Sequence, residues 1–148
     1  MLEEPIEAKK KIGYLPDEPP IYDDMRVVDY VVYAAKLNQV PADCLKQRVE
    51  QALDVLSLQD VRNRVIGNLS KGYRQRVGLA QAIVHQPEVL ILDEPTEGLD
   101  PNQIVLIREL IQNLGGKHTI LLSSHILSEV QNTCDEIIII DRGKVVKK

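Results

Sequence analysis

The sequence predicts an α/β fold in which a mostly parallel sheet is combined with helices and a helical subdomain. In residues 69–148, short aliphatic runs typical of buried strands alternate with segments whose apolar residues recur at helical spacing. In residues 25–68 the spacing is helical and no strand pattern occurs. A length of 148 residues favours one domain.

The first half of the chain is expected to hold one strand and two helices. A strand is predicted over residues 11–15, and a proline-rich loop follows it. One helix is predicted over residues 27–37 and a second begins near Pro41. The apolar faces of these helices consist of Val27, Val31, Ala34 and Ala35, and of Leu45, Val49, Ala52, Leu53 and Leu56.

The second half is expected to alternate helices and strands. Ser70 can cap a helix over residues 73–84 that ends before Pro87. Asp100 followed by Pro101 predicts the start of another helix, which stops at Gly115-Gly116. The remaining predicted elements are buried strands at residues 89–92 and 119–122, a helix at 126–133, and a strand at 137–140 that turns at Arg142-Gly143 toward Val145-Val146.

Composition and charge exclude several classes of function. The net charge is −4 and the basic residues are scattered, so the electrostatic footprint of a nucleic-acid-binding protein is missing. Cys44 and Cys134 lack metal-like spacing and are expected to be reduced thiols of a cytosolic protein. No stretch approaches the roughly 20 apolar residues that span a bilayer, so any membrane role is expected to come through a partner.

Two carboxylates follow the aliphatic strand at residues 89–92. A strand that ends in Asp93 places this carboxylate at the carboxyl edge of the sheet, where open α/β folds bind ligands. Asp93 would face a magnesium ion directly or through water, and Glu94 could act as a general base toward an attacking water. The alternative is a charged strand end followed by a turn.

A second group of residues, Ser70-Lys71-Gly72, lies at the predicted start of a helix. The hydroxyl group, the free backbone N–H groups and the positive end of the helix dipole together favour anion binding. The alternative is that Ser70 is a simple N-cap.

These segments together resemble the ATPase subunits of ABC transporters. LSKGYRQRVGLAQAI resembles the LSGGQ signature, ILDEPTEGLDP resembles the Walker B motif and D-loop, and SSH at residues 123–125 resembles the switch histidine. Upstream, IGYLPDEPPIYDDM resembles the loop that joins the catalytic core to the helical subdomain. The motifs occur in the family's order and spacing, and the resemblance covers essentially all 148 residues.

The resemblance implies a partial domain of the phosphate-loop NTPase type. Residues 1–148 would be the C-terminal portion of an ABC ATPase domain. Residues 14–68 would form the linking loop and helical subdomain, and residues 69–148 would hold the signature motif, Walker B, D-loop and switch histidine.

The resemblance also implies roles for single residues. Asp93 would support Mg²⁺ and Glu94 would activate water. His125 would hold the γ-phosphate of ATP and the attacking water. Ser70 and Gly72, with Lys71 between them, would contact ATP bound to the opposite subunit of a head-to-tail dimer, and Asp100 would communicate across that dimer.

The sequence departs from the family pattern at three places. Asp17 stands where the linking loop has Gln, so its magnesium contact is altered or made by a carboxylate. Lys71 and Tyr73 replace the first glycine and the glutamine of the signature, a form that resembles a bacterial exporter-like branch, including gliding-motility and sodium-efflux types.

The phosphate-binding loop of the family is also missing. Neither Gly116-Lys117 nor Gly143-Lys144 fits the pattern G-x-x-x-x-G-K-[ST]. The hypothesis is that the chain is part of a longer protein that hydrolyses ATP, that this part alone is inactive, and that its exposed aliphatic strand faces promote oligomerisation.

The expected function is therefore that of the ATP-binding and ATP-hydrolysing subunit of an ABC transporter. Its partners would be a transmembrane permease subunit and a second ATPase subunit, without nucleic acid, at the inner face of the cell membrane. Two alternatives remain: an ABC-type ATPase acting on DNA or ribosomes, and a non-catalytic module in which residues 14–68 dock a partner. Neither the transported substrate nor the direction of transport follows from the sequence.

Overall fold

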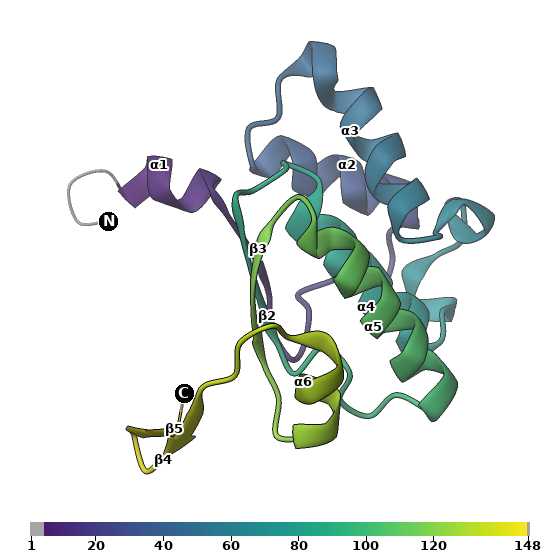
Figure 1. The fold of residues 1–148 in the computed structure, drawn as a ribbon. Helices are drawn as coiled ribbons and strands as arrows, with labels where there is room; N and C mark the ends of the chain where they lie inside the picture. Colours follow the sequence, from purple (N-terminus) through teal and green to yellow (C-terminus); the bar gives the residue numbers. More distant parts are fainter. Residues whose placement is uncertain (1–4, 148) are drawn as a thin grey trace.

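The computed structural model describes residues 5–147 and has the α/β architecture predicted from the sequence (Figure 1). A short helix that the sequence patterns did not reveal, α1 (Pro5–Lys10), precedes the first strand. The other elements are β1 (Ile12–Leu15), α2 (Val27–Leu37), α3 (Ala42–Val55), the 3₁₀ turns η1 (Gln59–Val61) and η2 (Ile66–Asn68), α4 (Lys71–Ile83), β2 (Val89–Asp93), α5 (Pro101–Gly115), β3 (Thr119–Ser123), α6 (Leu127–Thr133), β4 (Ile139–Asp141) and β5 (Lys144–Lys147).

The centre of the fold is a three-stranded parallel sheet with the order β1-β2-β3. Leu92 pairs with Leu15 on one side and with Leu122 on the other, while Asp93 pairs with Ser123. Parallel strands require crossover connections, which the helices between them supply. Helices α2 to α5 lie on one side of the sheet (Figure 1). The carboxyl ends of all three strands therefore meet at one edge.

The two faces of the sheet differ in exposure because strand side chains alternate between them. On the helix-covered face, Leu15, Leu90 and Leu92 are fully buried. On the opposite face, Tyr14, Ile91 and Leu121 form one row across the three strands, and Tyr14 and Leu121 are 49% and 60% exposed.

The prediction that residues 119–122 form a buried strand is thus wrong, although the strand itself is confirmed. None of α2 to α5 covers the face that Leu121 occupies. The expectation of an exposed aliphatic strand face is confirmed at this row.

Helices α2 and α3 bury the apolar faces that their spacing predicted. Val27, Val31, Ala35 and Leu53 are fully buried or nearly so, and belong to the same core as the covered face of the sheet. Backbone bonds tie the start of α2 to the loop that precedes α4, with Val27 N–H donating to the Arg64 carbonyl at 3.1 Å. Residues 25–68 therefore form a mainly helical unit packed against α4.

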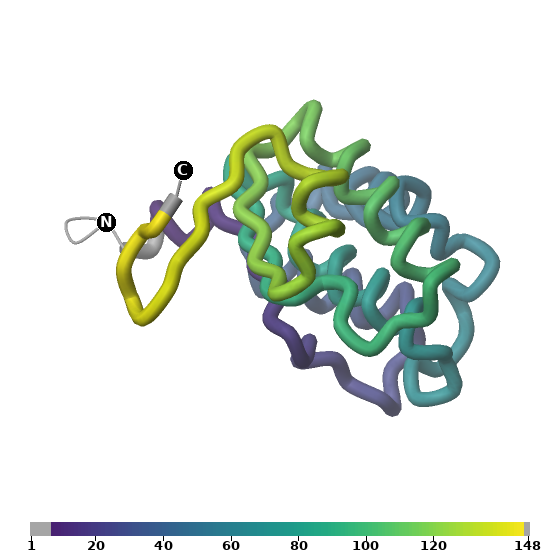
Figure 2. Tube along the Cα trace, turned by 60° about the horizontal axis from the view of Figure 1, so that its bottom comes forward, coloured from purple at the N-terminus to yellow at the C-terminus, as the bar shows by residue number. Residues whose placement is uncertain are grey.

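The C-terminal strands β4 and β5 pair with each other as an antiparallel hairpin separate from the central sheet. The turn between them places Arg142 and Gly143 at φ values of 46° and 75°, as the predicted turn required. Figure 2 shows the hairpin projecting away from the body of the fold, and Ile140 is 65% exposed. Among residues 5–147, no helix has the length and apolar character needed to cross a membrane.

Candidate functional site

The site begins where β2 and β3 end side by side. Asp93 is the last residue of β2 and pairs in register with Ser123, the last residue of β3. The Ser123 hydroxyl donates a hydrogen bond to Asp93 Oδ1, and its oxygen accepts one from the Glu94 N–H at 3.2 Å. Ser123 lies within the SSH segment but was not singled out from the sequence. It fixes one oxygen of the Asp93 carboxylate.

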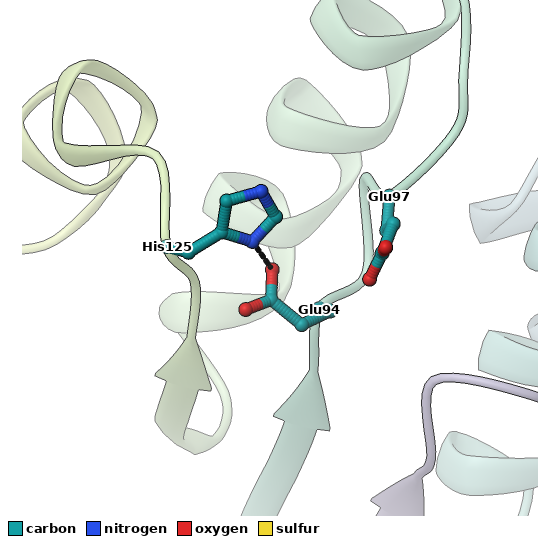
Figure 3. A group of neighbouring side chains, drawn as sticks. All are labelled: Glu94, Glu97 and His125. Carbon is teal, nitrogen blue, oxygen red and sulfur yellow. Dashed lines mark ion pairs between the residues drawn. The ribbon is translucent and has the colours of Figure 1, made fainter.

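The backbone of Glu94 turns sharply after β2. Its φ is +44°, in the left-handed region that residues with a side chain seldom adopt. A bond from its N–H to the Ser123 carbonyl at 3.2 Å helps to hold this conformation. Its Oε2 lies 3.1 Å from His125 Nδ1, as Figure 3 shows. The structure thus joins the two residues that the sequence analysis assigned to catalysis.

The electrostatics of this pair favour a charged imidazole. The hydrogen bond that His125 donates to Glu94 raises the pKa of His125, and the negative charge of Glu94 adds to the effect. Partial desolvation of the imidazole opposes this rise in pKa, and smaller contributions from Glu97 and Glu129 act in the same direction as Glu94. Since the His125 side chain is 65% exposed, solvent screens this attraction. The imidazole is therefore both polarised by Glu94 and open to a ligand.

Ser70 caps α4 as predicted. Its side chain accepts a bond from the Tyr73 N–H at a long 3.5 Å, and its backbone is extended. The Tyr73 hydroxyl donates to Asp60 of η1 at 2.7 Å, and Arg74 pairs with Asp23 at 2.7 Å. These contacts connect the start of α4 to η1 and to the loop that precedes α2.

The start of α4 also abuts the turn between β2 and α5. A Cβ placed on buried Gly72 would lie 2.6 Å from the side chain of Gln103 in α5. A Cβ on Gly98 would lie 2.2 Å from the Lys71 ammonium, and Gly98 has a φ of +65°. The positive φ of Gly98 favours glycine at this position, whereas a side chain at Gly72 would have to displace the side chain of Gln103.

Asp100 has a structural role in its own helix. Its Oδ1 accepts bonds from the Asn102 and Gln103 N–H groups, each at 3.1 Å, and Pro101 occupies the first helical position. This arrangement confirms the predicted cap and start of α5.

Two further residues lie near this edge of the sheet, and only Asp17 was singled out from the sequence. Buried Thr96 donates a hydrogen bond to Glu129 of α6, which links the turn after β2 to the helix that follows His125. No sequence pattern predicted this contact.

Asp17 is exposed and lies two residues beyond β1, whose Leu15 pairs with Leu92. It is near the same edge, but within the described residues no side-chain hydrogen bond or ion pair joins it to Asp93.

The comparison with known protein families agrees with this arrangement. The family model described as ABC transporter matches residues 3–97, which is more than half of the chain. The chain belongs to the ABC transporter family. ATP-binding domains of this family bind nucleotide. The α/β fold class that the ABC resemblance implied is confirmed.

Curated ABC transporter proteins align along nearly the whole chain. The chain is 39% identical to the ABC transporter ATP-binding protein NatA of Bacillus subtilis, over 98% of its own length and 60% of NatA. It is 42% identical to an ABC transporter ATP-binding protein of Nostoc, covering 93% of this chain and 42% of that protein. For the bacitracin transport ATP-binding protein BcrA of Bacillus licheniformis the identity is 36%, with coverage of 96% and 46%.

A solved ABC structure has the same fold. CbiO1 of Clostridium perfringens, described as part of the ABC transporter complex CbiONQ, superposes with a TM-score of 0.86 at 29% identity. The match covers 94% of this chain and 57% of that chain. The chain therefore spans roughly half the length of the ABC relatives it matches, between 42% and 60% of the three curated proteins.

Proposed function

We propose that this chain is part of the ATP-hydrolysing subunit of an ABC transporter. It would carry the residues that hydrolyse ATP and the residues that contact ATP bound to a second ATPase subunit. The observation that carries the proposal is the contact between Glu94 and His125 at 3.1 Å, at the sheet edge where Asp93 is also fixed. ATP and water would be converted to ADP and phosphate.

In this proposal Glu94 is the general base. Its backbone is left-handed and its carboxylate contacts His125, whereas the carboxylate of Asp93 is held by Ser123, which supports separate roles for the two acidic residues. Glu94 would accept a proton from the attacking water. His125 would orient Glu94 through Nδ1, while the other ring nitrogen points away from Glu94 and could donate to a γ-phosphate oxygen (Figure 3).

Asp93 fits the magnesium role by its chemistry. Carboxylate oxygens are the ligands that Mg²⁺ prefers, and Ser123 already orients one of the two oxygens of Asp93. The ion, when bound with ATP, neutralises charge on the phosphates. Asp17, near the same edge, is a weaker candidate for a second contact because no hydrogen bond or ion pair among residues 5–147 positions it.

Ser70, Lys71 and Gly72 would contact ATP held by a second ATPase subunit. Ser70 is exposed and its capping bond is long, which leaves the hydroxyl available to a phosphate. The α4 dipole and the first N–H groups favour the negative charge. The Asp100 side chain caps α5 and so holds the end of the turn after β2. Asp100 would communicate between the two ATPase subunits across the dimer.

The partners in this proposal are a second ATPase subunit, identical or different, and a transmembrane permease subunit contacted by residues 14–68. The protein would lie in the cytoplasm, at the inner face of the cell membrane. Relatives named for bacitracin transport and for the CbiONQ complex support a transport role over one on DNA or ribosomes.

The experiment is a phosphate-release assay on two proteins. The chain alone should release no phosphate above background, because its sequence holds no G-x-x-x-x-G-K-[ST] pattern. A longer protein in which such a loop precedes residue 12 should hydrolyse ATP in the presence of Mg²⁺. Sustained ATP-dependent turnover by the 148-residue chain, or none by the longer protein, would contradict the proposal.

A further inference from the structure

We propose that His125, Glu94 and Glu97 together form a binding site for a divalent transition-metal ion of the Zn²⁺ class. This position differs from the magnesium position at Asp93. The three side chains come from two loops that follow adjacent parallel strands, β2 and β3 (Figure 3).

The ligand atoms are already close. One nitrogen of His125 and one oxygen from each glutamate all lie within 4.8 Å of one another, and Nδ1 and the Glu94 oxygen are 3.1 Å apart. Ligand atoms around a tetrahedral Zn²⁺ are separated by about 3.4 Å, given bonds of roughly 2.1 Å. Only Glu97 has to approach, by about 1 Å or a little more on this estimate. Its side chain is exposed, so it can change rotamer freely.

The backbone brings the two carboxylates together. Glu97 N–H donates to the Glu94 carbonyl at 3.0 Å, which closes a turn directly after β2. This turn and the left-handed φ of Glu94 place one oxygen of each carboxylate within 4.8 Å of a His125 nitrogen. The site therefore needs little rearrangement of the main chain.

The donor set selects the class of metal. Imidazole nitrogen suits zinc, copper, iron and nickel, whereas Mg²⁺ prefers oxygen ligands in an octahedral arrangement. One histidine and two carboxylates supply three ligands and leave positions open for water, as in open zinc sites. Mg²⁺ should consequently compete poorly at this site.

Binding has a consequence for catalysis that rests on the proposed function. An ion held by Glu94 and His125 would occupy the general base and the residue that orients it, so Zn²⁺ would inhibit ATP hydrolysis. Binding itself requires neither nucleotide nor activity, and it can be tested separately.

The test is a Zn²⁺ titration of the 148-residue chain against a chromophoric chelator, without nucleotide and with a large excess of Mg²⁺. We expect one ion per chain at this site, and a loss of affinity of at least about 10-fold in Glu97→Gln and in His125→Asn. The matched control is Glu136→Gln, an exposed glutamate outside the cluster, which should bind like the unmodified chain. Circular dichroism checks that each variant is folded.

Substitution by Co²⁺ supplies a second readout, because visible absorption reports the ligand geometry and should weaken in the same two variants. Unchanged Zn²⁺ affinity in both variants, or no binding in the presence of Mg²⁺, would overturn the proposal. Either result would leave the role of Glu94 in hydrolysis untouched, since that role is measured as phosphate release.

Discussion

His125 Nδ1 lies 3.1 Å from Glu94 Oε2, so two loops that follow neighbouring strands converge on one ion pair. The contact depends on Glu94 having a φ of +44° and on the bonds that Ser123 makes with Asp93 and Glu94. Its exposed position leaves room for a ligand.

The first prediction concerns His125. In a longer protein that contains the phosphate-binding loop, His125→Ala should lower kcat by about 100-fold or more, since loss of one positioned hydrogen-bond donor to developing charge costs about 10²–10³-fold. Steady-state phosphate release measures the effect, and nucleotide binding should persist. His118→Asn is the control, because His118 donates to the Pro87 carbonyl from Nδ1, which an asparagine amide can imitate. Equal losses in both variants would contradict the assigned role.

Ser123→Ala should destabilise the chain by about 1 kcal/mol, because the hydroxyl bonds to both Asp93 and Glu94. Chemical denaturation monitored by circular dichroism measures the change. Ser128→Ala, an exposed serine on α6, serves as the comparison and should change stability little. Identical unfolding midpoints for Ser123→Ala and the unmodified chain would show that the Ser123 bonds contribute nothing.

Two Gly→Ala substitutions should have opposite outcomes. In β1, a Cβ on Gly13 would lie 2.1 Å from the Ala82 carbonyl oxygen, so Gly13→Ala should destabilise the fold by about 2 kcal/mol or more. At Gly115 nothing lies within 4 Å, and alanine is favoured in a helix, so Gly115→Ala should be neutral or stabilising. Thermal unfolding of both variants provides the measurement. A tolerated Gly13→Ala would mean that β1 and α4 do not pack as described.

His85 should make stability depend on pH. Burial lowers its pKa below the ordinary 6.5, while its bond to the Ile12 carbonyl opposes the shift and nearby His118 adds to it. The unfolded chain then binds more protons than the folded chain below pH 6.5, so stability should fall as the pH decreases through that value.

His85→Gln keeps an amide donor for the Ile12 carbonyl but cannot titrate, and it should flatten this part of the curve. Urea unfolding between pH 5 and about 8 measures the slope, since unperturbed histidine titrates in this range. A slope that stays the same in His85→Gln would assign the pH dependence to other groups.

The open sheet face should promote self-association of the chain. Tyr14 and Leu121 expose 49% and 60% of their surface in one row, and exposed apolar patches favour association. Leu121→Ser should shift the population toward the monomer in light scattering, whereas Leu37→Ser, which replaces another exposed leucine on α2, should shift it less. A compact monomer of the unmodified chain would count against this expectation.

The sequence was most informative where local rules dominate. Apolar spacing predicted α2 to the residue, and the caps Ser70 and Asp100 predicted the starts of α4 and α5 within about two residues. The burial of residues 119–122 was mispredicted because an aliphatic run does not reveal whether both faces of a strand are covered.

Within the candidate site, motif order placed Asp93, Glu94 and His125 at one sheet edge. The roles of Ser123, Glu97 and Thr96 depend on the register of β2 with β3 and on the turn after β2, which no local pattern encodes. Asp17 shows the reverse case, since its position in the sequence suggested a contact that no bond in the described chain supports.

The central claim is that Glu94 is the base for ATP hydrolysis, and Glu94→Gln in the longer protein tests it most directly. Single-turnover phosphate release should slow by about 100-fold or more while ATP binding is retained, because the amide keeps the size of the carboxylate but cannot accept the proton. Glu136→Gln should hydrolyse ATP at the unmodified rate. Phosphate release by Glu94→Gln at the unmodified rate would contradict the claim.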